Sequence, residues 1–434
     1  MRRKLAGAEG ALNGERTGDL VTNGPTASKG PLDGVKVLDL THYISGPYCT
    51  KLFADYGADV VKIERPDGGD RARWIAPFWH DRPHLEGSGL FLHLNSNKRS
   101  VTVNLKSEAG RKIVLDLVKD ADILVESFSP RVMPSVGLDY QTLHGVNPNL
   151  VMTSISNFGQ DGPYRDYKLA EINLYAMGST MISTGMPDRP PVKLGLTVEH
   201  FFAGMVSATA TMGAFFGGEG QHLDLSLFEI QVGNQDRSVQ GLMMYQYTGG
   251  SFVGSGPPRA GGTSAGRNIL PAGVYPVADG YVQFFTLAPH WDRICRVIER
   301  PDLIDDPFFT APENFSGNAE AKAMFDAILI EWCVQHTKRE VMERSQAEGY
   351  MCGAINTVED VFDDPHLAVR GFFTEIDHPY TGPLKYPGAQ FKMSETPWRP
   401  GRAPLLGEHT QEVLTQRLGY SNEDVAMLRA QGAI

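Results

Sequence analysis

The chain has 434 residues, too many for one ordinary hydrophobic core, so its length favours two domains or one domain with a large additional lobe. With 41% hydrophobic and 21% charged residues it can bury a core, which excludes a disordered or fibrous protein. The 51 Asp and Glu residues exceed the 40 Lys and Arg residues, and a formal charge of −11 argues against nucleic acid as a partner.

The cysteine spacing and the apolar stretches indicate the cellular compartment of the protein. The four cysteines lie far apart and form no CxxC pair: Cys49, Cys295, Cys333 and Cys352. This spacing excludes a zinc ribbon or a disulfide scaffold and favours the reducing cytoplasm. The charge-free, largely apolar stretch 201–218 is shorter than the roughly 20 apolar residues of a membrane span, so we predict a buried helix and no membrane partner. No apolar core follows the basic N-terminus, so we predict no export signal and a cytoplasmic protein.

The first ordered elements are expected after a mobile tail. Residues 1–30 are rich in Gly, Ala, Thr, Asn and Ser and have no hydrophobic period. Residues 35–40 alternate as a strand, Pro47 favours the first turn of a helix that runs through Asp55, and 59–64 form a second strand. Strand, helix and strand in this order make a βαβ unit, which predicts a parallel sheet with helices on both faces.

The same pattern repeats downstream. The short apolar runs 101–105, 122–126 and 150–156 are typical of strands, and 107–119 is predicted to be a helix capped by its first serine. Because strands alternate with helical patterns, we predict a Rossmann-like, doubly wound α/β domain over residues 31–230.

The pattern changes after residue 230. The segment 248–268 is dense in glycine and is predicted to be a long mobile loop. Residues 273–277 and 281–285 flank an Asp-Gly pair and predict a β-hairpin, and helical patterns follow it. We therefore predict a smaller α+β domain at 231–346 and a return segment, 347–434, that completes the large domain.

Common nucleotide and metal motifs are absent. The first strand runs into residues 41–47 without a GxGxxG sequence, and no P-loop occurs, which argues against a dehydrogenase or an NTPase. No HExxH motif or histidine–carboxylate cluster at ligand spacing occurs, so we predict no metal site. A GxSxG elbow is also absent, so hydrolysis through a serine is not supported.

Three local clusters could carry chemistry. Lys98 and Arg99 are adjacent cations in a polar loop and could hold a phosphate, although a solvated turn would have the same sequence. Arg65 follows a parallel strand, where open α/β sheets bind ligands, but this segment in isolation favours a surface ion pair. Glu171 begins an apolar helix after a glycine-rich loop, where a carboxylate is stabilised; an N-terminal helix charge is its simplest role.

Taken in order, several motifs resemble one family. They are 31–40 (PLDGVKVLDL), Gly46-Pro47-Tyr48, 56–64 (YGADVVKIE), 97–100 (NKRS), 125–130 (VESFSP), 159–164 (GQDGPY) and 403–410 (APLLGEHT). Over about residues 31–418 the sequence resembles the class III CoA-transferases, the family of formyl-CoA transferase and carnitine CoA-transferase, to which α-methylacyl-CoA racemase also belongs. The resemblance implies a large doubly wound domain, a smaller domain and an interlocked dimer of ring-shaped subunits.

The resemblance also implies site residues. The family's catalytic aspartate, which begins the helix after the Gly-Pro-Tyr loop, falls on Glu171, so the acid is kept but is longer by one methylene. Two family contacts are not matched: the family's asparagine falls on Ser127, and an arginine falls near Ser135. Glu199 would support the site. The residues that match the family's CoA contacts are Arg65, Lys98, Arg99 and Phe128.

The implied activity moves CoA from an acyl-CoA thioester, succinyl-CoA being a common donor in the family, to a carboxylic acid acceptor. The Glu171 carboxylate would form an acyl anhydride and then a glutamyl-CoA thioester. Coenzyme A is thus a co-substrate, and neither a metal nor ATP is needed. A glycine stretch around Gly261 and Gly262 would close over the site and keep out water.

Two other functions remain open beside the transferase. The racemase branch is marked by a Gly-His-Asp pattern at this position. Here Ala170 replaces the histidine, and alanine cannot transfer a proton. The second alternative is a catalytically silent subunit that binds CoA in a heteromer, which the exchange of aspartate for Glu171 leaves open. For the transferase itself the resemblance implies a homodimer.

Overall fold

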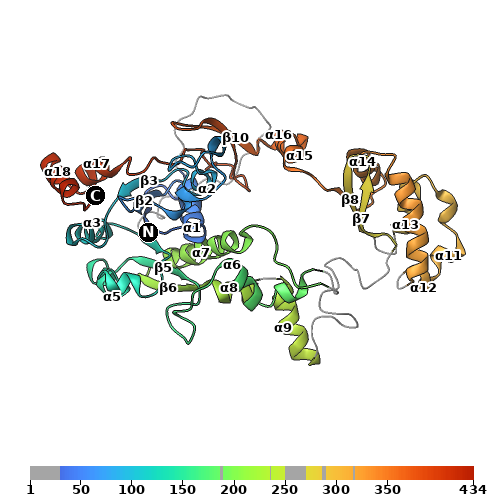
Figure 1. The fold of residues 1–434 in the computed structure, drawn as a ribbon, viewed down its shortest axis with the longest axis horizontal. Coiled ribbons are helices and arrows are strands. Elements are labelled where there is room, and N and C mark those ends of the chain that lie inside the picture. Colours follow the sequence, from blue (N-terminus) through green and yellow to red (C-terminus); the bar gives the residue numbers. More distant parts are fainter. Residues whose placement is uncertain (1–29, 186–188, 235, 250–269, 286–289, 316–317) are drawn as a thin grey trace, which may run out of the picture. The chain divides into compact units, whose positions relative to one another are not determined.

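The computed structural model describes residues 30–185, 189–234, 236–249, 270–285, 290–315 and 318–434 (Figure 1). The chain divides into two compact units. The first comprises Met1–Leu174, Leu196–Ile230 and Gly371–Ile434, and the second comprises Tyr175–Gly195 and Gln231–Arg370. All but the last residue of the predicted tail, and most of the predicted glycine-rich loop with Gly261 and Gly262, lie outside the described residues.

A six-stranded parallel sheet forms the centre of the first unit. Its strands are β1 (Lys36–Leu40), β2 (Asp59–Glu64), β3 (Arg99–Thr102), β4 (Ile123–Glu126), β5 (Val151–Ser156) and β6 (Gln221–Ser226). They lie in the order β3-β2-β1-β4-β5-β6, and every pairing is parallel. The order reverses between β1 and β4, as in doubly wound folds. The predicted α/β architecture is confirmed, and β6 is a strand that the sequence did not predict.

Alternating residues of the strands build two cores, one on each face of the sheet. Leu38 and Leu40 of β1 pack with helix α3 (Glu108–Val118) on one face of the sheet. Val37 points to the other face, where it packs with α1 (Ser45–Asp55) and α7 (Val198–Gly217). Both faces are apolar because parallel strands are covered on both sides. The Ser107 hydroxyl caps α3 by accepting a hydrogen bond from the Gly110 N–H, as its sequence predicts.

Helix α7 contains nearly all of the charge-free stretch 201–218. Its glycine at 204 lets it approach α1 closely: a Cβ there would lie 2.7 Å from the Ser45 carbonyl oxygen. The small residues of this helix therefore serve helix packing. Across the described residues, no helix is both long enough and apolar enough to cross a bilayer.

Shorter elements complete the first unit. They are the 3₁₀ turns η1 (Arg71–Trp74) and η2 (Trp79–Asp81), α2 (Gly89–Leu94), α4 (Val132–Ser135), α5 (Tyr140–Val146), α6 (Glu171–Met177), α8 (Leu227–Asn234), β10 (Phe373–His378), β11 (Gly382–Pro387), α17 (Thr410–Glu412), the π-helical turn η6 (Val413–Arg417) and α18 (Asn422–Ala430). α6 and α8 run on into the second unit. The C-terminal segment packs on the sheet, where the Thr102 N–H donates to Thr410 Oγ1 at 3.0 Å.

The second unit is built on a three-stranded antiparallel sheet. Strands β7 (Ala272–Val277) and β8 (Gly280–Phe285) form the predicted hairpin, and β9 (Cys352–Ala354) pairs with β8. The other elements are η3 (Met181–Ser183), α9 (Asp236–Thr248), α10 (Trp291–Val297), η5 (Pro301–Leu303), α11 (Pro307–Thr310), α12 (Pro312–Phe315), α13 (Ala319–Cys333), α14 (Lys338–Ala347), α15 (Val358–Phe362) and α16 (Pro365–Arg370). Because β9 completes this sheet, the unit extends to Arg370, beyond the boundary at 346 that the sequence suggested.

Candidate active site

A cavity of about 900 Å³ opens at the carboxyl ends of β1 and β4 in the first unit. This is the point where the strand order reverses, and such points are where open α/β sheets bind ligands. His42 and Tyr43 reach the cavity from the connection after β1, Ser45 from the start of α1, and Phe128 from the connection after β4. The cavity therefore collects side chains from both halves of the sheet.

Glu171 lies in the wall of this cavity. It is the first residue of α6, as predicted, and it is 7% exposed. Its Oε1 accepts a hydrogen bond from the Glu199 N–H at 2.9 Å, in the first turn of the 20-residue helix α7. Backbone N–H groups there have no partner within the helix, so they stabilise a carboxylate. Asp166 is the other acid that lines the cavity, and it is paired with Arg131 at 2.5 Å.

Three further hydrogen-bonding side chains, those of Tyr43, Ser45 and His200, line the same cavity as Glu171. The Tyr43 ring meets the His200 ring edge-on, with the centroids 5.0 Å apart, and His200 Nδ1 lies 2.8 Å from Ser45 Oγ. Burial and, after it, the negative charge of Glu171 raise the pKa of Tyr43 above its ordinary value. The phenol thus keeps its proton and remains a hydrogen-bond donor in the cavity.

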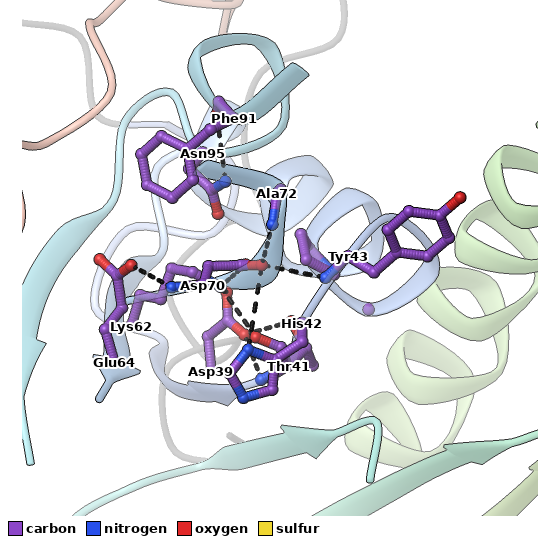
Figure 2. A network of polar contacts seen from close by, with 12 residues as sticks. Asp39, Thr41, His42, Tyr43, Lys62, Glu64, Asp70, Ala72, Phe91 and Asn95 are labelled. Carbon is purple, nitrogen blue, oxygen red and sulfur yellow. Dashed lines mark hydrogen bonds and ion pairs between the residues drawn. The ribbon is translucent and has the colours of Figure 1, made fainter. Parts of the chain in front are cut away.

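A buried ionic network holds the connection after β1 in place (Figure 2). Asp70 is fully buried; its Oδ1 accepts hydrogen bonds from the Tyr43 N–H at 3.0 Å and the Ala72 N–H at 2.8 Å. Its Oδ2 pairs with Lys62 Nζ at 2.8 Å, and Lys62 also donates to the Thr41 carbonyl oxygen. These contacts join the connection after β1 to the one after β2. They hold Tyr43 at a φ of 75°, a left-handed conformation that is unusual for such a residue.

Lys98 belongs to the same interior and not to the cavity wall. Its Nζ is bonded to Asp39 Oδ2 at 2.9 Å and to the Pro47 carbonyl oxygen, the Thr50 hydroxyl and the Asn95 side chain. Burial lowers the pKa of Lys98 to about 8, although the charge of Asp39 acts in the opposite direction. The ammonium group is already used inside the fold, so the structure does not place it to hold a phosphate.

The side chain of Arg99 is directed toward the amino ends of the strands, away from the cavity. It is the first residue of β3, and its guanidinium group contacts Asp59, the first residue of β2, at 2.5 Å. The amino ends of parallel strands point away from the carboxyl ends where the cavity opens. The structure therefore does not bring Arg99 to the predicted CoA site, and the adjacent cations Lys98 and Arg99 serve two different structural roles.

The remaining predicted CoA contacts lie nearer to the cavity. Phe128 lines it, with its ring 5.3 Å from the ring of His42. Arg65 is exposed directly after β2, and it is not part of the cavity wall. Burial lowers the pKa of His42, and the charge of Arg65 contributes to this effect. Arg65 is thus close enough to influence His42 electrostatically.

Glu126 binds the backbone of Phe128, and its burial leads us to expect that stability depends on pH. Its Oε2 accepts the Phe128 N–H at 2.7 Å, and burial raises the pKa of Glu126 to about 7. A carboxyl with a raised pKa in the folded state contributes stability below its unfolded value of 4.5 and loses it as pH rises through 7. We therefore expect the free energy of unfolding of Glu126→Gln, measured relative to that of the wild type, to rise by roughly 3 kcal/mol between pH 4 and pH 8.

This difference is measured by chemical denaturation of both proteins across that pH range. Glu108→Gln, a change at an exposed helix position, serves as the control. A stability difference between Glu126→Gln and wild type that does not vary with pH would contradict the assignment.

Several cavity residues were not singled out from the sequence. Tyr43 and Ser45 follow the first strand of a parallel sheet, and this position is the one feature of the sequence that could have indicated them. Arg71 and His200 come from distant segments and had no local signal. Glu199, predicted as a support, is 1% exposed and contacts Glu171 through its backbone. No group of three or more potential metal ligands is present in the part of the chain that the structure describes.

Comparison with known sequences identifies relatives of nearly the whole chain. The sequence model described as "CoA-transferase family III" matches residues 32–410. A formyl-CoA:oxalate CoA-transferase from Rhodopseudomonas palustris strain BisA53 is 34% identical over 420 residues, covering 93% of this chain and 97% of the relative. One of the same name from Streptomyces avermitilis is 33% identical, with coverage of 93% and 99%.

Solved structures share the fold. A CAIB/BAIF family protein from Brucella suis is 30% identical and superposes with a TM-score of 0.77, covering 89% of this chain and 99% of that one. The orthorhombic form of Rv3272 from Mycobacterium tuberculosis is 26% identical, with a TM-score of 0.71 and coverage of 88% and 99%.

Proposed function

Because the chain belongs to CoA-transferase family III, we propose that it moves CoA from an acyl-CoA thioester to a carboxylic acid, with Glu171 as the nucleophile. The observation that carries this proposal is the position of the Glu171 carboxylate, in the wall of the cavity at the switch point and bonded to the N–H of Glu199. The other acid in the wall, Asp166, is neutralised by Arg131 and so is a poorer nucleophile.

The reaction proceeds in four balanced steps. A Glu171 oxygen attacks the donor thioester carbonyl, the C–S bond breaks, and CoA leaves as the thiolate with a mixed anhydride on Glu171. The thiolate attacks the glutamyl carbonyl, which releases the donor carboxylate and leaves a glutamyl-CoA thioester. The acceptor carboxylate attacks this thioester and expels the thiolate, giving a second anhydride. The thiolate then attacks the acceptor's acyl carbon, which forms the new acyl-CoA and regenerates the carboxylate.

The contacts of Glu171 suit these steps. Whenever the glutamyl carbonyl is attacked, its remaining oxygen becomes an oxyanion, and the Glu199 N–H already donates to Oε1 in the resting state. The protonated phenol of Tyr43 is a second donor nearby. Donors that are in place before the reaction need not reorganise as charge develops, which is the main source of such stabilisation.

The relatives suggest where to look for substrates. Their names specify formyl-CoA as donor and oxalate as acceptor, and we propose this pair as the first to test, with succinyl-CoA as a second donor. Phe128 and Arg65 are the residues that we propose contact CoA, because one lines the cavity and the other lies close to it. We do not include Lys98 or Arg99, since their charges are used within the fold.

Covalent trapping tests the proposal. We expect hydroxylamine to convert an activated glutamyl carbonyl to a hydroxamate only when acyl-CoA, and not free CoA, is supplied. Trypsin releases Glu171 in peptide 169–193 and Glu199 in peptide 194–237, so mass spectrometry reports the two glutamates separately. Modification confined to 169–193 is the expected result. Turnover without any modification, or modification of 194–237 instead, would show that Glu171 is not the nucleophile.

Isomerisation of an acyl-CoA is a second candidate, favoured by one observation. Ala170 replaces the histidine of the racemase pattern, but the structure brings His200 into the same cavity as Glu171. A histidine and a carboxylate in one cavity could exchange a proton with the α-carbon of a bound acyl group. Incorporation of deuterium from D2O into an acyl-CoA, without transfer to any carboxylate, would favour this function over the first.

Assembly and location stay predictions. The family resemblance implies an interlocked homodimer, with a heteromer as the alternative and the cytoplasm as the compartment. Light scattering of the purified protein measures the mass of the assembly directly, and a mass equal to one chain would contradict both assemblies.

A further inference from the structure

We propose that Arg71 binds the second carboxylate of a dicarboxylate acceptor and so selects that acceptor over a monocarboxylate. This inference rests on the proposed CoA transfer and names the residue that recognises the acceptor. It is carried by the fixed backbone around Arg71, by the position of its guanidinium group beside Tyr43, and by the lack of a carboxylate partner for it among the described residues.

The backbone at Arg71 is held on both sides. Its neighbours Asp70 and Ala72 are both fully buried, and the Asp70 carboxylate accepts the Ala72 N–H at 2.8 Å. The same carboxylate oxygen accepts the Tyr43 N–H at 3.0 Å (Figure 2). Arg71 itself is exposed and lines the cavity. The buried network therefore presents one arginine side chain to the cavity from a rigid turn, η1.

The guanidinium group of Arg71 lies beside Tyr43 in the wall of the cavity that also contains Glu171. Arg71 Cζ is 5.9 Å from the centroid of the Tyr43 ring. Burial raises the pKa of Tyr43 most, the charge of Glu171 raises it further, and the charge of Arg71 lowers it. The charges of Glu171 and Arg71 thus act on the same phenol, in agreement with their places in the wall of one cavity.

The other cations of the cavity differ from Arg71. Arg131 and Arg165 both contact Asp166, whereas no ion pair of Arg71 occurs within the described ranges. Lys168 also lines the cavity, but it lies in an irregular segment just before α6 and carries a point charge. A guanidinium group offers two parallel N–H donors that match a carboxylate. Arg71 is therefore the better partner for a planar, second carboxylate.

The chemistry requires such a partner only for a dicarboxylate. One carboxylate of the acceptor attacks the glutamyl-CoA thioester, and the other remains charged within the cavity. An unpaired charge there would have to be desolvated without compensation, which is costly. Arg71 would offset this cost for a dicarboxylate and would itself lack a partner with a monocarboxylate.

The test compares acceptors in wild type, Arg71→Met, Arg71→Lys and Lys168→Met. Oxalate, malonate and succinate are the dicarboxylates, and formate, acetate and propionate are the matched monocarboxylates. We expect Arg71→Met to raise KM for the preferred dicarboxylate by about 10- to 100-fold, the value of one charge-assisted contact, while KM for the monocarboxylates changes less than about twofold. Arg71→Lys should fall between wild type and Arg71→Met. Arg82→Met, at an exposed position outside the cavity wall, controls for overall charge.

Several results would overturn the inference. They are an equal loss with both acceptor classes, a larger dicarboxylate defect in Lys168→Met than in Arg71→Met, and a wild-type enzyme that prefers monocarboxylates. A rise in KM for acyl-CoA alone would assign Arg71 to a CoA phosphate instead. All of these leave the trapping of Glu171 intact, so they are distinguishable from failure of the proposed function, in which no acyl-CoA modifies that residue.

Discussion

Replacing Glu171 with glutamine is expected to abolish CoA transfer, lowering kcat/KM by at least about 10⁴-fold, as loss of a covalent nucleophile does elsewhere. The amide keeps the size of the side chain and can still accept the Glu199 N–H, so the fold should be retained. It cannot form an anhydride, because an amide is too weak a nucleophile. Steady-state transfer between an acyl-CoA and a carboxylate, followed by chromatography of the CoA esters, measures the effect.

Two matched variants sharpen this experiment. Glu171→Asp restores the acid that the family usually carries but draws it back by one methylene, so we expect partial activity. Glu199→Gln changes the neighbouring buried glutamate, whose contact with Glu171 runs through the backbone, and should retain most of the activity if Glu171 is the nucleophile. A Glu171→Gln variant with wild-type transfer, or a larger loss in Glu199→Gln, would move the nucleophile away from Glu171.

Asp39→Asn is expected to destabilise the first unit by about 3–5 kcal/mol, because it leaves two buried ammonium groups with too little negative charge. Asp39 is 0% exposed and lies 2.9 Å from Lys98 Nζ and 3.7 Å from Lys62 Nζ. Burial by itself would raise the pKa of Asp39, but these two charges and the nearby hydroxyls hold it well below its usual range. Thermal and urea unfolding of the variant and the wild type measure the loss.

A double-mutant cycle separates charge balance from simple damage. The network contains two carboxylates and two ammonium groups, so it carries no net charge: Asp39, Asp70, Lys62 and Lys98. Asp39→Asn or Lys98→Met alone leaves one charge unbalanced. The double variant removes one charge of each sign and keeps the Lys62–Asp70 pair. We therefore expect the double variant to lose less stability than the sum of the single losses. Lys112→Met, which breaks an exposed ion pair, should change stability little. Strictly additive losses would refute the coupling.

The buried network also links the two largest predictions. Asp39 and Lys62 are paired within β1 and β2. The Asp70 carboxylate, in the connection after β2, holds the backbone of Tyr43 (Figure 2). Variants of the network are therefore expected to affect transfer as well as stability, since Tyr43 and Arg71 depend on the same turn. The fold and the candidate site are stabilised by one set of contacts.

Much of the secondary structure was evident in the sequence. Apolar alternation located β1, β2, β4 and β5 nearly to the residue, a serine cap marked the start of α3, and an Asp-Gly pair marked the turn between β7 and β8. Such signals are local, because period and capping depend on residues a few positions apart. Glu171 was found at the start of α6 for the same reason.

The roles of the charged residues were decided only by the tertiary structure. Lys98 and Arg99 are neighbours in the sequence, yet one is enclosed with Asp39 and the other pairs with Asp59 at the amino end of the sheet. Arg71 and Glu171 are a hundred residues apart and meet at one cavity. Burial and ion pairing depend on which strands lie side by side and at which end, and the sequence by itself contains the elements but not this arrangement.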